Sequence, residues 1–152
     1  MEVVATQDSV NHMATQLARE YRALWDGLFS RQIDTDSFQI GAKKLKDNRF
    51  SLEGHTLETA EVGHSDTDET TFLHVASLNM VVAGDIVYND SRGGAWLVTL
   101  ILLESYNPAI VVASPHSPGA MDGAFSIGAS KEYTSTFSQL VQELTSAKEL
   151  YD

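Results

Sequence analysis

One stretch in the middle of the chain restricts the fold more than any other. Residues 80–90 read Met-Val-Val-Ala-Gly-Asp-Ile-Val-Tyr-Asn-Asp, so a short apolar run is followed at once by a glycine and a carboxylate. Such a run between turn residues predicts a strand over residues 80–83 that is buried on both faces. Because ligands gather at the carboxyl ends of strands in α/β folds, Asp85 is a candidate site residue. Asp is also a common turn residue, so a role in capping the turn is the alternative.

The composition limits the classes of protein to which the chain can belong. Its 152 residues, 43% of them hydrophobic, predict one domain over residues 1–152 with a core of ordinary size. The net charge of −11 argues against a nucleic-acid surface, which requires a positive patch. No apolar run approaches the ~18 residues of a membrane span and no signal peptide opens the chain, so we expect a cytoplasmic protein with no membrane partner. Because the chain has no cysteine, any metal must be held by His, Asp or Glu.

Hydrophobic periodicity predicts an α/β fold with a helix at each end of the chain. An apolar stripe that recurs every three to four residues predicts a helix over residues 9–29, with Ser9 as its N-cap. A β-hairpin that turns at Gly54-His55 opens an α/β core over residues 49–119, and a last helix is expected over residues 122–150. Within the core we expect three strands and one helix that is well buried on much of its circumference: strands 71–75, 80–83 and 109–113, and helix 95–106.

Two histidines join Asp85 at the ends of predicted strands. His64, Asp85 and His116 each follow a strand, so all three could lie at one edge of the sheet. Two imidazoles and a carboxylate form a plausible zinc ligand set, and an open fourth position would suit hydrolysis. Two His and one Asp on loops also occur by chance in many proteins. The alternative that these residues bind no metal therefore remains open.

Several longer runs of the sequence, taken in order, share a pattern with a known family. The runs are residues 52–58 (Leu-Glu-Gly-His-Thr-Leu-Glu), 61–71 (Glu-Val-Gly-His-Ser-Asp-Thr-Asp-Glu-Thr-Thr), 73–78 (Leu-His-Val-Ala-Ser-Leu), 81–89 (Val-Val-Ala-Gly-Asp-Ile-Val-Tyr-Asn), 110–113 (Ile-Val-Val-Ala) and 117–119 (Ser-Pro-Gly). Together they resemble the metallo-β-lactamase-fold hydrolases over most of the chain. The resemblance implies a two-sheet αββα sandwich with a binuclear zinc site, in which His64 is a zinc ligand and Asp85 bridges the two metals.

The sequence departs from this family where most of the metal ligands should be. The family's His-x-His-x-Asp-His signature is absent from the 152 residues. Pro115 stands where the family has its last histidine ligand, and His116 is one position late. The resemblance therefore implies the C-terminal part of the fold only: an α/β, truncated half-sandwich with one mixed β-sheet and flanking helices. Because catalytic zinc needs three protein ligands, we expect no catalysis, assign no catalytic residue and expect no cofactor, with zinc as the alternative.

Truncation also predicts a bare face on the sheet. In the complete fold a second sheet covers strands such as 80–83 and 109–113, and without it one apolar face would be exposed. We therefore expect the chain to self-associate through this face as a homodimer or higher oligomer. The predicted helix over residues 9–29 is another candidate cover.

Three functions from different classes follow from these expectations. The first is a non-catalytic, oligomeric remnant of a metallo-β-lactamase-like fold that binds a small ligand or a protein. The second is a zinc-dependent hydrolase whose site is completed across a subunit interface by His64, Asp85 and His116. The third is a fragment of a larger enzyme, against which an initiating Met1 and a complete terminal helix argue mildly.

Overall fold

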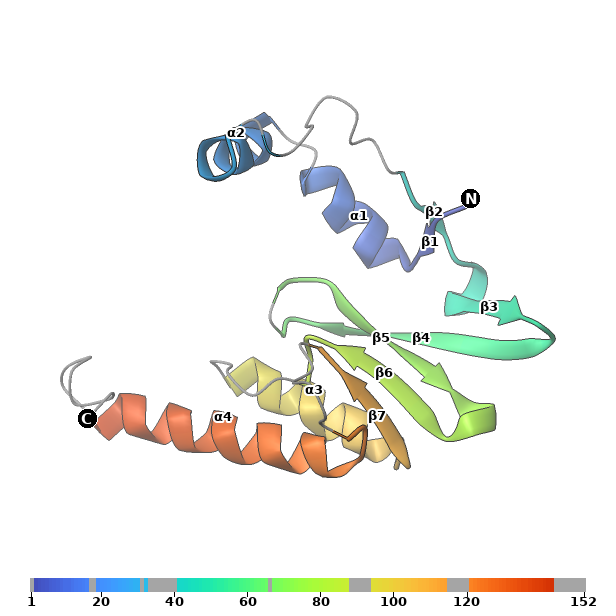
Figure 1. The fold of residues 1–152 in the computed structure, drawn as a ribbon, viewed down its shortest axis with the longest axis vertical. Coiled ribbons are helices and arrows are strands. Elements are labelled where there is room, and N and C mark those ends of the chain that lie inside the picture. The colour runs from blue at the N-terminus through green and yellow to red at the C-terminus, as the bar shows by residue number, and fades with distance from the viewer. Residues whose placement is uncertain are drawn as a thin grey trace.

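A five-stranded mixed sheet forms the centre of the computed structural model (Figure 1), which describes residues 2–16, 19–30, 32, 41–65, 67–87, 94–114 and 121–143. Its strands lie in the order β3-β4-β5-β6-β7. The strands are β3 (Arg49–Leu52), β4 (His55–Gly63), β5 (Thr70–Val75), β6 (Met80–Gly84) and β7 (Ile110–Ala113), with the short 3₁₀ helices η1 (Lys46–Asn48) and η2 (Ala76–Leu78) before β3 and after β5. Neighbours are antiparallel except β6 and β7, which are parallel. The predicted α/β class and mixed sheet are confirmed.

Two helices and a small parallel sheet precede the five-stranded sheet, where the sequence predicted one helix over residues 9–29. They are β1 (Val4–Ala5), α1 (Gln7–Gln16), α2 (Arg19–Leu28) and β2 (Lys43–Lys44), with β1 paired to β2. The predicted start was also wrong. Thr6, not Ser9, caps α1, because the Thr6 hydroxyl oxygen accepts a hydrogen bond from the Ser9 backbone N–H (3.3 Å) and the Thr6 carbonyl accepts the first helical bond from Val10 (3.0 Å).

The second half of the chain forms a β-α-β unit and a long helix on one side of the sheet (Figure 1). Helix α3 (Gly94–Ser105) connects β6 to its parallel neighbour β7 and corresponds to the helix predicted over residues 95–106. Helix α4 (Phe125–Glu143) packs beside α3, and Lys131 of α4 forms an ion pair with Glu104 of α3 (2.7 Å). The helix predicted over residues 122–150 corresponds to α4, and residues 144–150 lie outside the described residues.

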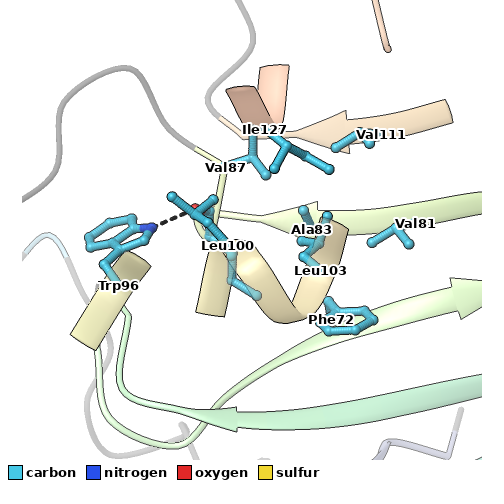
Figure 2. Packing of buried hydrophobic residues seen from close by; sticks show 10 residues of the cluster. Phe72, Val81, Ala83, Val87, Trp96, Leu100, Leu103, Val111 and Ile127 are labelled. Carbon is cyan, nitrogen blue, oxygen red and sulfur yellow. Dashed lines mark hydrogen bonds between the residues drawn. The ribbon is translucent and has the colours of Figure 1, made fainter. Parts of the chain in front are cut away.

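The core lies between the sheet and these two helices. Figure 2 shows its side chains converging from both layers, and the indole N–H of Trp96 donates a hydrogen bond to the carbonyl oxygen of Ile86 (2.6 Å). The cluster consists of Phe72, Val81, Ala83, Ile86, Val87, Trp96, Leu100, Leu103, Val111 and Ile127. It therefore draws on the strands, on α3 and α4, and on the turn after β6.

Burial alternates along β6, so the prediction of a strand buried on both faces was wrong. Val81 and Ala83 are almost completely buried against the helices, whereas Met80 and Val82 are only half-buried. Side chains of consecutive strand residues point to opposite faces, so these two pairs lie on opposite faces of the sheet. In the described structure α3 and α4 pack on one of those faces.

Helix α3 also differs from its predicted burial. Leu100 and Leu103 are fully buried, but Val98 is 68% exposed and Ile101 is 55% exposed. The sequence offered no way to tell these residues apart, because both faces of the helix are apolar. One side of α3 is core and the other is a surface.

The hairpin between β3 and β4 turns one residue earlier than predicted. Its two central residues are Glu53 (φ 51°) and Gly54 (φ 85°), while His55 already belongs to β4 and pairs with Leu52. Two-residue hairpins favour positive φ at both central positions, because this turn matches the twist of the strands. Gly54 adopts that geometry without strain, and Glu53 does not.

Candidate functional site

The carboxyl ends of three strands meet at one edge of the five-stranded sheet, which we call the carboxyl rim. Strand β4 ends at Gly63, opposite the start of β5, and β6 ends at Gly84, opposite Ala113 at the end of β7. The register of β5 against β6 keeps these ends level. His64 and Asp85 are the first residues past β4 and β6, so both follow strands that end at this rim.

His64 is held by a carboxylate four residues further along the same loop. Its Nδ1 donates to Oδ1 of Asp68 (2.7 Å), and both side chains are largely exposed. The buried Thr99 hydroxyl of α3 donates to the His64 carbonyl oxygen (3.3 Å), which fixes the backbone of this loop against the helix layer. A carboxylate on one ring nitrogen is how proteins orient a metal-binding imidazole, but an exposed His–Asp pair is equally a surface ion pair.

Asp85 lies in the turn that follows β6, and its side chain is exposed. The turn itself is closed by the backbone, because the Ile86 N–H donates to the Ala83 carbonyl oxygen (3.2 Å). Among the described residues no side chain or backbone group bonds the Asp85 carboxylate. The turn therefore forms without a capping bond from this carboxylate to any described group.

The third predicted ligand, His116, lies outside the described residues. Within the described part of the chain no group of three His, Asp or Glu side chains is placed to hold a metal ion. Catalytic zinc requires three protein ligands, so the described residues alone do not provide a zinc site. Asp68, which was not among the predicted ligands, contacts His64, and its position four residues after His64 in the same loop is the sequence signal for this pair.

A third histidine, His74 of β5, has a structural environment. Its ring packs edge-on against Tyr106 (centroids 4.9 Å apart), and its Nδ1 is buried without a hydrogen bond, 4.0 Å from Oε2 of Glu58. Glu58 in turn pairs with Arg49 across the hairpin (2.9 Å). His74 lies on the helix-covered face of the sheet, because it is opposite the fully buried Val81. It is part of the packing there and not of the rim.

A shallow groove of about 770 Å³ lies elsewhere, at the start of α1. It is lined by Gln7, Lys44, Leu45, Lys46, Asp47, Asn48 and Glu61. The lining mixes both charge signs and is open to solvent, so it does not favour one class of ligand. Neither His64 nor Asp85 contributes to it.

Comparison with known proteins identifies the fold. No protein-family model and no curated protein matches the sequence. A metallo-beta-lactamase family protein from Thermus thermophilus is 11% identical with a TM-score of 0.62, and the match covers 93% of this chain and 54% of that chain. For a metallo-beta-lactamase from Pontibacter korlensis the identity is 16% and the TM-score 0.52, with 76% and 55% of the two chains covered. The DIM-1 metallo-beta-lactamase is 18% identical with a TM-score of 0.51, and the match covers 80% of this chain and 57% of that chain.

The chain therefore has a metallo-β-lactamase-like fold and spans about half the length of these proteins. The resemblance stated from the sequence motifs is confirmed at the level of the fold. None of the helices in the described residues is long and apolar enough to cross a membrane.

Proposed function

We propose that this chain is a non-catalytic, oligomeric binding module built on half of a metallo-β-lactamase-like fold. The observation that carries the proposal is the face of the sheet turned away from α3 and α4. From Leu73 onward on β5, and along β6 and β7, the side chains on this face are all apolar. We call them the outer face: Leu73, Val75, Met80, Val82, Ile110 and Val112.

The outer face is incompletely covered. Of its six side chains Val75 is buried and four are half-buried, whereas Ile110 on the edge strand is 37% exposed. The N-terminal elements reach the other end of this side of the sheet, where the Asp8 N–H donates to Oε1 of Glu61 on β4 (3.3 Å). A contiguous apolar surface of this kind, with a parallel edge strand beside it, favours burial against another protein surface. A second copy of the chain is the partner that we propose.

The same half-fold argues against catalysis by one chain. His64 and Asp85 are the two predicted ligands that fall within the described residues, and two ligands do not hold a catalytic zinc ion. The His-x-His-x-Asp-His signature is also absent from the 152 residues, which supports a role in binding rather than in hydrolysis by a single chain.

Light scattering during gel filtration tests the oligomer. At micromolar concentration we expect the wild-type chain to have at least the mass of a dimer. Ile110→Asp places a charge on the outer face and should produce monomers, whereas the control Val98→Asp, on the exposed side of α3, should leave the mass unchanged. Circular dichroism confirms that each variant is folded. A monomeric wild-type protein would overturn the proposal.

A zinc-dependent hydrolase completed across a subunit interface is the second candidate. It is favoured by the 2.7 Å contact between His64 and Asp68, which leaves the other ring nitrogen for a ligand, and by the unpaired Asp85 carboxylate among the described residues at the same rim. Metal analysis combined with ester, lactam and thioester substrates distinguishes the candidates. Hydrolysis that rises and falls with bound zinc, and that His64→Ala and Asp85→Ala abolish, would replace the non-catalytic proposal.

A further inference from the structure

Helix α2, together with Phe29 directly after it, carries an apolar stripe that nothing in the described core covers. Leu24 and Leu28 are 54% and 63% exposed, and Trp25 and Phe29 are each 41% exposed. The two aromatic rings stack on each other one helical turn apart, with centroids 5.8 Å apart and an interplanar angle of 21°. Residues three or four positions apart are neighbours on a helix surface, as in the pairs 24/28, 25/29 and 25/28, so these four side chains form a single surface. Exposed aromatic and leucine side chains in one stripe are typical of a helix that docks on another surface.

From this stripe we infer that α2 of one copy docks on the outer face of a second copy, and that α2 of the second copy docks in the same way on the first. The inference rests on the proposed function and names the segment that forms the interface. Two apolar surfaces lie on the same chain without covering each other, and a twofold dimer pairs both at once. Each copy then contributes one helix and receives one.

The sizes of the two surfaces agree. Helix α2 has 10 residues, which corresponds to a length of about 15 Å. Strands β5, β6 and β7 lie side by side with about 4.8 Å between neighbours, so their outer face is about 10 Å wide between the first and last strand axes. One helix of about 10 Å diameter therefore covers the three strands.

Charge favours the N-terminal segment as the part of a second copy that approaches the sheet. Residues 1–49 contain seven of the ten Lys and Arg residues and seven of the 21 Asp and Glu residues, so they are neutral overall. The remaining residues, 50–152, therefore carry the whole net charge of −11. Two acidic cores repel each other, whereas a neutral segment approaches the acidic core without that cost.

The connections of the N-terminal segment favour a second copy over the chain's own sheet. Helix α1 is attached to its own core at its first turn, where the Asp8 N–H donates to Glu61 (3.3 Å) and the Ser9 hydroxyl donates to the carbonyl oxygen of Glu69 (3.4 Å). From that attachment α1 leads away from the strands to α2, which lies apart from β6 and β7 in Figure 1. In this arrangement the four side chains of the stripe stay exposed on their own subunit.

Cysteine cross-linking tests the inference, because the natural chain has no cysteine to interfere. Two differently tagged proteins, one with Leu28→Cys and one with Val82→Cys, are mixed and oxidised mildly. We expect a disulfide-linked heterodimer that forms ~10-fold faster than with the control pair Leu28→Cys and Val98→Cys, because docking raises the local concentration of the thiols. Val98 is 68% exposed, so the control thiol is at least as accessible as the test thiol.

The outcomes separate the inference from the proposed function. A dimer in light scattering with rapid 28–82 cross-linking supports both. A dimer in which the 28–82 and 28–98 pairs link at equal rates overturns the inference alone. A monomer overturns both, as does a Leu28→Cys/Val82→Cys double variant whose disulfide forms within one chain of a monomeric protein.

The fluorescence of Trp25 gives a second measurement that needs no cysteine. Docking removes the half-exposed indole from water, so dilution from micromolar to nanomolar concentration, which dissociates the dimer, should shift the emission to longer wavelength. Trp25→Phe should abolish that shift and leave the emission of the buried Trp96 in place. An identical shift in the variant would overturn the inference.

Discussion

Because one face of α3 is buried and the other is exposed, the same substitution on the two faces should change the unfolding free energy by different amounts. Leu100 is fully buried in the core cluster, and Leu102, on the same helix, is 39% exposed. Replacing either leucine by alanine removes the same atoms and gives the same change in helix propensity. Any difference in unfolding free energy between Leu100→Ala and Leu102→Ala therefore reports the packing around each side chain.

The expected magnitudes follow from that packing. Leu100→Ala removes buried atoms and leaves a cavity between the sheet and α3, which costs about 3–4 kcal/mol. For Leu102→Ala water fills the vacated space, so only part of the transfer free energy is lost, about 1 kcal/mol. In a chain of this length the first loss corresponds to a decrease in Tm of roughly 6–16 °C.

Urea denaturation followed by circular dichroism measures both variants, at one protein concentration so that self-association affects them equally. A loss for Leu102→Ala as large as that for Leu100→Ala would refute the assignment of the two faces. It would mean that the outer side of α3 is covered, as the sequence alone had predicted.

Three further substitutions test local features of the fold. Glu53→Asn should raise the unfolding free energy by about 0.5–1 kcal/mol, because asparagine tolerates the positive φ of the hairpin turn; an unchanged value would contradict the turn geometry. Thr6→Ala should lower it by about 1 kcal/mol through loss of the α1 cap, and Thr6→Ser should retain the wild-type value; equal losses would assign the effect to packing. Asp68→Ala should change it by less than about 1 kcal/mol, because its pair with His64 is exposed; a larger loss would show that the loop depends on this pair.

The sequence predicted the strands and the β-α-β order well because each element is marked by local signals. Gly54 and Gly84 mark the ends of strands, and Pro108 stands between α3 and β7. Such signals depend on backbone conformation, which neighbouring residues largely determine. They fix element type and order, and leave errors of up to three residues at the boundaries, as at the start of α1, where Thr6 and not the predicted Ser9 is the cap.

Burial was predicted less well, for a different reason. In β6 and in α3 nearly every residue is apolar, so the pattern has no period that separates an inner from an outer face. Which face is covered depends on elements far away in the sequence. Val82 and Ile101 are residue types typical of a core. In the structure Val82 is half-buried and Ile101 is exposed, because no described helix or strand packs fully against those sides of β6 and α3.

The rim and the outer face share β6, and this connection separates the two candidate functions. Val82 belongs to the outer face, and Asp85 follows three residues later at the carboxyl rim. In the proposed dimer the second copy would therefore lie beside the rim, where it could add ligands to it. If the protein is a hydrolase completed across the interface, Ile110→Asp should remove bound zinc together with the dimer, although Ile110 is no candidate ligand.

If the protein is a non-catalytic binding module, the same substitution should abolish the dimer without changing the zinc content. Metal analysis of Ile110→Asp and of the control Val98→Asp, both purified with zinc in the buffer and then dialysed, measures the difference. Zinc lost only with the dimer assigns His64 and Asp85 to a shared metal centre. Equal zinc in both variants leaves Asp85 as an exposed carboxylate at the end of a strand whose role is to bind a second copy.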